Sequence, residues 1–506
     1  MPDRRTLVTV TVACCLIAAR PMARTIGVGS AFELQRALDE ARGGDTIVLQ
    51  RGTEYVGNFV LRGRSAADTG VITVRTESDW GLPREGRRMN PAYAPRLARL
   101  RSPNGQPVVR TEPGAHHWRL LLLEFPANAG GLGDIVALGD GSRWQRRLDE
   151  VPHHLAVERV YIHGDPTLGQ KRGIALNAAN VAIRDSWVGD IKAVGQDSQA
   201  IAGWNGPGGY LIENNWLEAA GENVLFGGAD PSIPGLVPSD IVIRGNTLTK
   251  PTAWRERGPR RWSVKNLLEL KNARRVLIEE NLLARAWQDG QTGYGVLLTV
   301  RNQDGGCPWC TVASVRFERN RVRDTGGGVQ VIGADPEYPT QPMQEISIRD
   351  NVFEGIDRNA WGGDGYFLLL GGRPSGVAID HNTIVSGASG GLIKIANGPS
   401  VDFSFTNNIA THGDFGIIGT NRGVGDDSIR TYLPGARIEG NVIVGGNAAR
   451  YPPGNIFPRP EVLMRHFQGE REGNYRLVPA SPWRRAGTDG RDIGADHRGV
   501  PSAQGF

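Results

Sequence analysis

A six-residue phrase, apolar–x–x–Asn–x–apolar, recurs between residues 212 and 443 and constrains the fold of the chain more than any other feature. Successive asparagines of the phrase lie 26 to 39 residues apart. A period in this range is typical of solenoids, in which each repeat packs only on its neighbours. The eight copies carry Asn215, Asn246, Asn281, Asn320, Asn351, Asn382, Asn408 and Asn441.

The segments between the asparagines favour strands over helices. They contain short β-branched runs that Gly, Asn and Asp interrupt, and they lack a helical pattern of 10–15 residues. This excludes leucine-rich and helical repeats and predicts an all-β, right-handed parallel β-helix of about ten or more coils. Asparagine tolerates left-handed backbone and bonds its own backbone, so a fixed asparagine in each coil suits a ladder of stacked amides at a turn. Two earlier copies carry Val160 and Ser186 instead.

The ends of the repeat set the domain boundaries. Ala31–Arg42 has helical spacing behind Ser30 as N-cap, which predicts a short capping helix at the start of the solenoid. Residues 78–107 and 126–154 lack a period and are expected to be long loops. The phrase fades after Asn441. We therefore expect one β-helix domain over residues 24–445 and a C-terminal tail over 446–506 that packs on its end.

Residues 1–23 are predicted to be a signal peptide. Two arginines precede the apolar run Leu7–Ala19, and Pro21-Met22-Ala23 follows it. The apolar run is too short to span a membrane, so we expect a secreted or periplasmic protein. Of the four cysteines, Cys307 and Cys310 remain after cleavage, and they predict a small loop disulfide.

The charge balance narrows the range of partners. The net charge is +5, and no run of Lys or Arg indicates nucleic-acid binding. A mild basic excess is compatible with an acidic polymer as partner. A monomer without a membrane span is expected.

The stretch Val264–Asn272 contains the candidate site. When the inward-facing Leu270 and Val300 of successive coils are aligned, Lys271 and Arg301 follow them and stack on adjacent coils. Two cations held ~5 Å apart repel each other unless an anion lies between or over them. A carboxylate of a substrate could meet that need. The alternative is a structural ion-pair network with Glu269.

Other residues on these coils are candidates for binding a sugar. The longest repeats carry inserted loops, and inserts in a solenoid often form the binding face. Aromatic rings there could stack on sugar rings, and amides could bond hydroxyl groups. The candidate substrate-binding residues are Trp204, Asn223, Trp254, Asn302 and Gln303.

The asparagine phrase, over roughly residues 31–445, resembles the right-handed parallel β-helix superfamily of pectate lyases and polygalacturonases. The Lys271–Arg301 pair is most similar to chondroitinase B-like and alginate lyases. That resemblance implies β-elimination on a uronate polysaccharide, with Lys271 as base and Arg301 neutralising charge. It also implies a calcium ion, for which Glu222, Asn223 and Glu269 are the candidate ligands. The chain departs from those lyases because only one residue separates Glu269 from Lys271, and a second nearby acid is missing.

Two other functions stay open. Glu222 and Glu269 could act as a carboxylate pair in a glycoside hydrolase. The polygalacturonase motifs are incomplete, however, because Asn382-Thr383 is followed by Ile384. A non-catalytic carbohydrate-binding or cell-surface β-helix is the third possibility.

Overall fold

The computed structural model describes residues 22–256, 261–387, 389–469 and 473–503. Most of the predicted signal peptide, residues 1–21, lies outside the described residues. Within the described ranges, every helix is too short or too polar to cross a bilayer.

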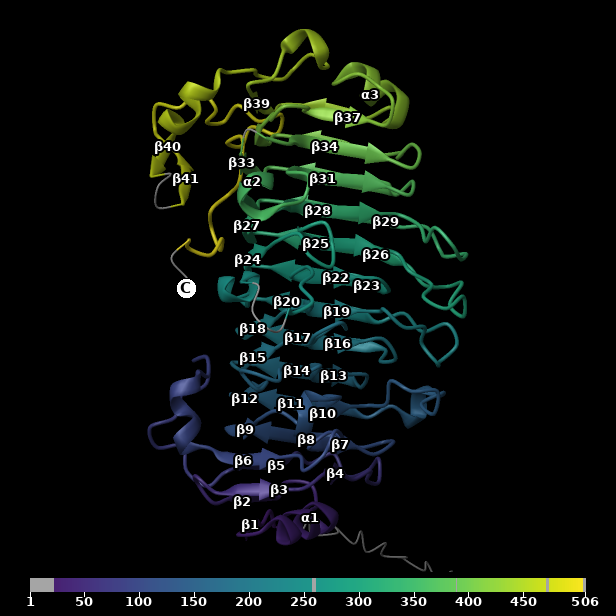
Figure 1. Cartoon of the computed structure of the whole chain (residues 1–506), viewed down its shortest axis with the longest axis vertical. Coiled ribbons are helices and arrows are strands. Elements are labelled where there is room, and N and C mark those ends of the chain that lie inside the picture. Colours follow the sequence, from purple (N-terminus) through teal and green to yellow (C-terminus); the bar gives the residue numbers. More distant parts are fainter. Residues whose placement is uncertain (1–21, 257–260, 388, 470–472, 504–506) are drawn as a thin grey trace, which may run out of the picture.

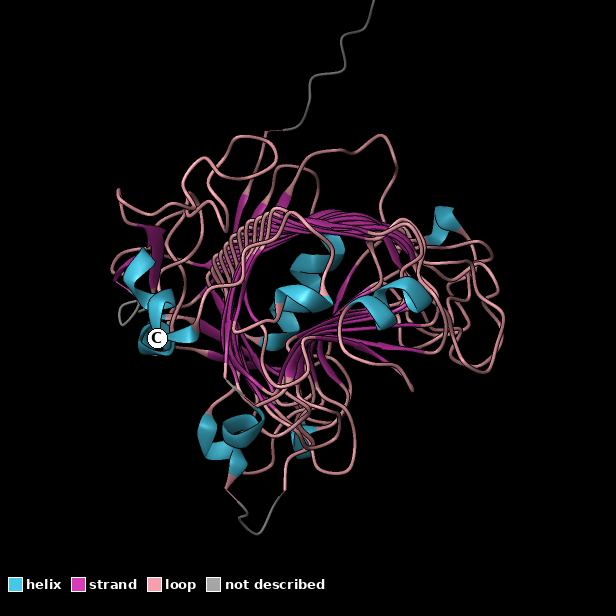
Figure 2. Cartoon of the chain, turned by 90° about the horizontal axis from the view of Figure 1, so that it is seen from above, coloured by secondary structure: helices cyan, strands magenta, loops and turns pink. Residues whose placement is uncertain are grey.

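The described strands form three long parallel sheets that wind around one interior, which confirms the predicted parallel β-helix (Figures 1 and 2). Sheet A comprises β1 (Thr25–Val28), β2 (Thr46–Leu49), β5 (Ile72–Thr76), β8 (His116–Leu121), β11 (His153–Glu158), β14 (Ala179–Arg184), β17 (Gly208–Glu213), β20 (Ser239–Arg244), β23 (Ala273–Glu279), β26 (Val312–Glu318), β29 (Gln344–Arg349), β32 (Ser375–Asp380), β35 (Ser404–Thr406) and β38 (Arg437–Glu439).

Sheet B comprises β3 (Glu54–Val56), β6 (Ala98–Arg101), β9 (Leu123–Phe125), β12 (Tyr161–His163), β15 (Trp187–Ile191), β18 (Trp216–Ala219), β21 (Thr247–Thr249), β24 (Leu282–Ala286), β27 (Arg321–Thr325), β30 (Val352–Ile356), β33 (Thr383–Ser386), β36 (Ile409–Thr411) and β39 (Val442–Val444). Sheet C comprises β4 (Phe59–Leu61), β7 (Val109–Thr111), β10 (Asp134–Leu138), β13 (Arg172–Leu176), β16 (Gln199–Gly203), β19 (Glu222–Phe226), β22 (Leu268–Leu270), β25 (Tyr294–Thr299), β28 (Gly327–Ile332), β31 (Tyr366–Gly371), β34 (Gly391–Ala396) and β37 (Ile417–Gly419).

Short helices lie in the loops between strands and at the two ends of the solenoid. They are α1 (Ala31–Glu40), α2 (Arg358–Trp361) and α3 (Asp426–Tyr432), with the 3-10 helices η1 (Pro91–Arg96), η2 (Ala129–Gly131), η3 (Leu148–Glu150), η4 (Thr252–Arg255), η5 (Ala448–Arg450) and η6 (Pro460–His466).

The asparagine ladder forms as predicted. Each side-chain amide donates to a carbonyl oxygen of the coil before it, and its oxygen accepts the backbone N–H of the preceding asparagine. Asn320, for example, donates to the Ile278 oxygen at 2.8 Å and accepts from the Asn281 N–H at 3.0 Å. The ladder begins at Ser186 and continues past the last copy of the phrase to Asn455. Its amides are buried, so these bonds satisfy backbone groups at the bend between sheets A and B.

Both ends of the solenoid are covered. At the N-terminal end, Ser30 caps α1, whose Leu34, Ala37 and Leu38 join the continuous core of the coils. At the other end, Ile429 of α3 packs into the same core. These caps shield the open ends of the core from water.

The C-terminal tail packs along the side of the solenoid and not only on its end. It folds back beside sheet B, where β40 (Phe467–Gly469) and β41 (Asn474–Leu477) pair (Figure 1). Arg321 of β27 donates to the backbone oxygens of Gly473 and Pro501, at 2.8 and 2.7 Å. The tail therefore reaches coils well before the last one.

Two segments expected to be long loops contain strands. β6 lies inside residues 78–107, and β10 lies inside residues 126–154. Both strands are only four or five residues long and carry no asparagine phrase, so neither leaves a period in the sequence. The coils therefore begin earlier than the phrase indicates.

Candidate functional site

A groove of 1220 Å³ runs along the outer face of sheet C from β7 to β22. Small outward residues, such as Ala137 and Ala175, leave space between the loops that border it. At ~4.8 Å between successive strands, the groove spans roughly 24 Å. The charged side chains that line it are Arg110, Asp134, Asp140, Glu150, Lys171, Arg172, Asp197 and Lys271.

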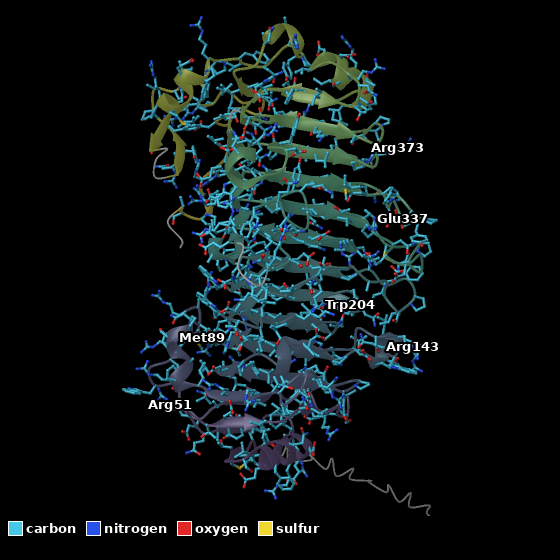
Figure 3. All side chains as sticks on the ribbon, in the orientation of Figure 1. Arg51, Met89, Arg143, Trp204, Glu337 and Arg373 are labelled. Atoms are coloured by element: carbon cyan, nitrogen blue, oxygen red, sulfur yellow. A yellow bond between two sulfur atoms is a disulfide. The ribbon has the colours of Figure 1, made fainter. Side chains whose placement is uncertain are left out.

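Two tryptophans also line the groove. The Trp204 indole N–H donates to the Gly141 oxygen at 2.8 Å, and the Arg172 guanidinium lies 5.0 Å from the ring centroid. Figure 3 shows Trp204 on this face of the solenoid and Arg143 on the loop that projects beside it. Trp144, on that loop, is 68% exposed. The structure thus places Trp204 in the groove, where a ring face can meet a sugar.

Lys271 forms the C-terminal end of the groove. It directly follows β22, and its ammonium nitrogen lies 3.6 Å from Glu269 Oε1. The preceding coil passes beneath it with Gly227 at φ 95°, and a Cβ at Gly227 would come within 2.8 Å of the Lys271 Cβ. Glycine is therefore required for this close approach, and it leaves the lysine side chain open to the groove.

Arg301 lies on the next coil, although the strand register pairs Leu270 with Leu298 and not with Val300, as the alignment had assumed. Its backbone N–H donates to the Lys271 carbonyl oxygen at 3.0 Å. Its guanidinium lies 3.4 Å from Asp335 Oδ2 and is 25% exposed. Each cation of the pair thus has a carboxylate of its own, and Asp335 is a partner that the sequence did not reveal. The groove wall ends at Lys271, one coil short of Arg301.

Glu222 and Glu269 are buried beneath the groove. Glu222 is 0% exposed and Glu269 is 2% exposed. Burial raises the pKa of Glu222, and the nearby Glu269 charge raises it further. Because neither carboxylate lines the groove, the pair is poorly placed for the direct attack that a hydrolase requires.

An ammonium group balances these carboxylates. Lys265 Nζ donates to Asp197 Oδ2 at 2.5 Å and lies 3.4 Å from Glu222 Oε1. Asn266 donates to Glu269 Oε2 at 2.9 Å. Burial lowers the pKa of Lys265, but Glu222, Asp197 and Glu269 outweigh that effect and raise it overall. The site therefore contains its own fixed positive charge.

Asn223 faces the interior of the coil. Its amide donates to the carbonyl oxygens of Leu217 and Thr249 at 2.7 and 2.8 Å. Its oxygen accepts from the fully buried Lys250 ammonium at 3.0 Å. This side chain is fully used inside the core and is not available to a substrate or an ion in the groove.

The three candidate calcium ligands do not fit a calcium site. Calcium takes six to eight oxygen ligands that face one point. Asn223 points away from Glu222 and Glu269, and the Lys265 ammonium lies against Glu222. A cation already present between the carboxylates opposes a second one.

The remaining candidates for substrate binding lie outside the groove wall. Trp254 packs with Trp262 and Trp287 in a separate cluster, and the Lys192 ammonium lies 5.2 Å from its ring centroid. The tryptophan therefore covers a hydrophobic corner of the solenoid.

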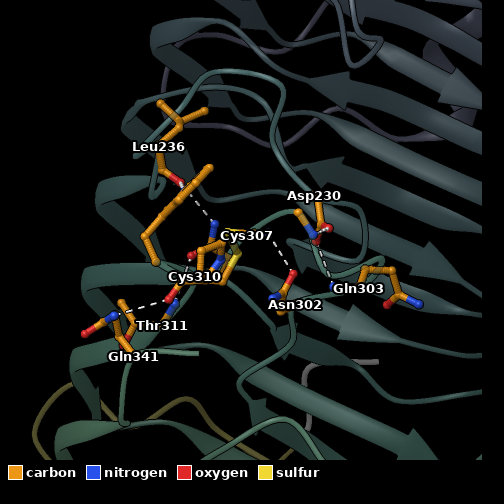
Figure 4. The surroundings of a disulfide bond; sticks show 12 residues. Asp230, Leu236, Asn302, Gln303, Cys307, Cys310, Thr311 and Gln341 are labelled. Atoms are coloured by element: carbon orange, nitrogen blue, oxygen red, sulfur yellow. Dashed lines mark hydrogen bonds between the residues drawn. A yellow bond between two sulfur atoms is a disulfide. The ribbon is translucent and has the colours of Figure 1, made fainter. Parts of the chain in front are cut away.

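Asn302 and Gln303 belong to a loop that neighbouring side chains hold (Figure 4). Asn302 is 0% exposed and accepts the Cys307 N–H at 2.7 Å. The Gln303 N–H donates to Asp230 at 2.7 Å. The predicted disulfide between Cys307 and Cys310 is confirmed in the same loop. Asn302 thus shapes the loop and cannot reach a substrate.

Lys171 and Arg172 line the groove, although the sequence did not single them out. Arg172 bonds Asp134 at 2.7 Å and Gln199 at 3.0 Å, across three coils. The sequence contained one usable indication, which is that Arg172 opens a strand at the outward position aligned with Gln199.

Comparison with known proteins shows the fold and not the family. No protein-family model matches the chain, and no curated protein sequence matches it. Among solved structures, it is similar to the PL6 family alginate lyase AlyGC, with a TM-score of 0.55, 15% identity, and coverage of 95% of this chain and 58% of that one. The chain thus spans somewhat over half of that lyase. It is also similar to the catalytic unit of a thermostable GH87 α-1,3-glucanase from Streptomyces thermodiastaticus strain HF3-3, with a TM-score of 0.51, 14% identity, and coverage of 86% and 71%. These likenesses and the three parallel sheets establish that the chain is a right-handed parallel β-helix protein.

Proposed function

We propose that this protein is a polysaccharide lyase, which cleaves a uronate-containing acidic polysaccharide by β-elimination. The observation that carries the proposal is Lys271, which stands at the end of a long groove with Arg301 on the adjoining coil. The fold likeness to a protein described as an alginate lyase supports it. The predicted signal peptide supports a secreted or periplasmic location, where such polymers are met.

The groove suits an extended, negatively charged chain. Arg110, Lys171 and Arg172 line it along with Lys271. Four carboxylates also line it: Asp134 is paired with Arg172 and Asp197 with Lys265, and the other two are Asp140 and Glu150. Trp204 offers a ring face at the middle of the groove. Carboxylates of a uronate polymer would therefore meet cations at several points along its length.

The reaction needs a base, charge neutralisation and a proton for the leaving group. Arg301 neutralises the uronate carboxylate, which acidifies the proton on the adjacent carbon. Lys271 is the base that removes that proton. The electron pair left on the carbon forms a carbon–carbon double bond and expels the glycosidic oxygen. That oxygen takes a proton from Lys271 or from solvent, so a single chain yields one unsaturated end and one ordinary end.

Lys265 holds the charge balance beneath the base. Its ammonium lies between Asp197 and Glu222, one of the candidate calcium ligands. Its positive charge therefore partly cancels the negative potential that Glu222 and Glu269 produce in the groove. The proposed reaction includes no step through a metal ion.

The test is the ultraviolet absorbance of the new conjugated double bond when the protein meets alginate, polygalacturonate or other uronate polymers. We expect absorbance to rise with wild type and to vanish in Lys271→Ala. The matched control is Lys394→Ala, which removes a 46%-exposed lysine of the same sheet outside the groove. It should keep full activity.

The other outcomes separate the alternatives. New reducing ends without a double bond would overturn elimination and favour a hydrolase. Binding without either product would favour a non-catalytic carbohydrate-binding role. Loss of activity in both lysine variants would show that Lys271 has no specific role in catalysis.

A further inference from the structure

Four of the nine histidines gather at one corner of the solenoid, outside the groove. His116-His117 opens β8, and His153-His154 opens β11 on the next coil. The parallel register pairs His153 with His116. Stacking two identical dipeptides therefore places four imidazole rings together, which we call the histidine cluster.

The rings are arranged as two stacked columns. His116 and His153 lie parallel with centroids 5.0 Å apart, and His117 and His154 lie parallel at 4.8 Å. Within each dipeptide the rings are nearly perpendicular, because His117 and His154 adopt left-handed backbone, with φ of 57° and 54°. This turn brings consecutive side chains to the same corner instead of to opposite faces.

The nitrogen atoms of the cluster converge. The two Nδ1 atoms are 2.8 Å apart in the first dipeptide and 2.7 Å apart in the second. One ligand nitrogen from each of His117, His153 and His154 lies within 4.8 Å of the others. In the described ranges, no other group of three or more His, Cys, Asp or Glu side chains converges in this way.

The fourth ring, His116, is only 2% exposed and stacks on His153. Its Nδ1 contacts the Nδ1 of His117, and it contributes no nitrogen to the converging group of three. His116 therefore holds the His117 and His153 rings in place.

The chemistry of the cluster selects the ion. Imidazole nitrogens suit zinc, copper and nickel, whereas calcium and magnesium require oxygen. The nearest charged groups, Arg64 and Asp68, form an ion pair at 2.6 Å, so local charge is balanced.

We propose that the histidine cluster binds one transition-metal ion of the zinc class through His117, His153 and His154. Two nitrogens at ~2.1 Å from zinc lie roughly 3.4 Å apart in a tetrahedral site. The ligand nitrogens of the three rings lie within 4.8 Å of one another, and those of His153 and His154 are 2.7 Å apart, so small side-chain rotations reach this spacing. The ion ties the β8 coil to the β11 coil. The site stands apart from the groove and does not depend on the proposed lyase activity.

The experiment is a calorimetric titration of the metal-stripped, tag-free protein with zinc near neutral pH, joined by melting curves. The test variant is His117→Asn/His154→Asn. Asparagine tolerates the left-handed backbone, and Asn180 already occupies the same corner position on the following coil with φ 51°. The double variant should therefore fold with the hydrogen bonds of sheet A intact. His466→Asn, on the tail, is the control for adventitious binding to a surface histidine.

We expect one zinc ion per wild-type chain and a zinc-dependent rise in melting temperature. Affinity should fall by at least about 100-fold in the double variant, because two of three ligands are lost. It should be unchanged in His466→Asn. Absence of stoichiometric binding by the wild type would overturn the proposal. So would equal binding by the double variant, or a loss in His466→Asn.

Discussion

Replacing Lys265 with methionine tests the charge balance beneath the groove. Methionine is close to lysine in length and apolar, so the substitution removes the ammonium and leaves most of the packing. Glu222 then loses the cation 3.4 Å from its Oε1 while it stays fully buried. The neighbouring Glu269 charge, which already raises the pKa of Glu222, has less to oppose it.

The size of the effect follows from distance and burial. At an effective dielectric constant of about 20, two unit charges 3.4 Å apart attract by about 5 kcal/mol. The contact to Asp197 adds little, because that carboxylate is 44% exposed. Removing one partner of a buried ion pair costs about 3–5 kcal/mol in measured cases. We therefore expect the free energy of unfolding to fall by about 3–5 kcal/mol.

The loss should depend on pH. The folded-state pKa of Glu222 lies above its unfolded value, and losing Lys265 raises it further. The carboxyl therefore contributes most to stability below its unfolded pKa, and that contribution is lost as pH rises through the folded pKa. The deficit of the variant should be smaller at about pH 5 than at about pH 8.

Urea unfolding followed by tryptophan fluorescence at both pH values measures the deficit. The matched control is Lys394→Met, whose pair with Asp364 at 3.2 Å is exposed and should be worth less than about 1 kcal/mol. A Lys265→Met cost no larger than that of Lys394→Met, or a deficit that grows on acidification, would refute the reasoning.

Three further expectations follow from other parts of the molecule. Asn320→Ala removes a ladder amide that hydrogen-bonds a carbonyl oxygen and an N–H of the preceding coil. Urea unfolding should show the free energy of unfolding falling by about 3–5 kcal/mol. A fall of less than about 1 kcal/mol would contradict a stabilising role for the ladder. Gly227→Ala places a Cβ 2.8 Å from the Lys271 Cβ, at a position whose φ is positive, and should displace the lysine. Steady-state kinetics on a polymer that the wild type cleaves should show turnover falling on the order of 100-fold, while the variant stays folded. Burial lowers the pKa of Lys250 to about 7 from 10.5, so between these pH values the unfolded chain binds a proton that the folded protein has released. The free energy of unfolding of the wild type should therefore rise with pH by several kcal/mol relative to that of Lys250→Met. Melting curves of both proteins, recorded at the same pH values, measure this difference.

The sequence predicted the parts of the fold that repeat. The asparagine phrase works because each amide must meet the same bend in every coil, so one residue type recurs at one place. The alignment of Leu270 with Val300 was wrong by two residues, because the strand register pairs Leu270 with Leu298. Arg301 still lies beside Lys271, because its backbone N–H donates to the Lys271 oxygen just beyond β25.

The residues that were misplaced lie where the strand departs from simple alternation. Asn223 and Val224 both face the interior, because the chain bends between sheets B and C at Asn223. Alternation of inward and outward residues, counted back from the inward Phe226, predicts an outward Asn223 and does not reveal that bend. Lys265 was missed because it precedes its strand and acts through a long side chain that reaches Glu222 on the coil before. Asn302 has a loop position whose burial depends on Asp335, 33 residues later.

The backward course of the tail has a consequence for how the solenoid comes apart. Contacts between adjacent coils alone would let the stack open from its C-terminal end one layer at a time. Arg321 of the β27 coil holds Gly473 and Pro501 of the tail, while the Gly494 N–H of the tail donates to the Asn407 oxygen at 2.8 Å on the β36 coil. The tail therefore bridges layers that do not touch each other. The upper coils must then open as one cooperative block. The layers that form the groove lie below this block, and their fluctuations are therefore independent of it.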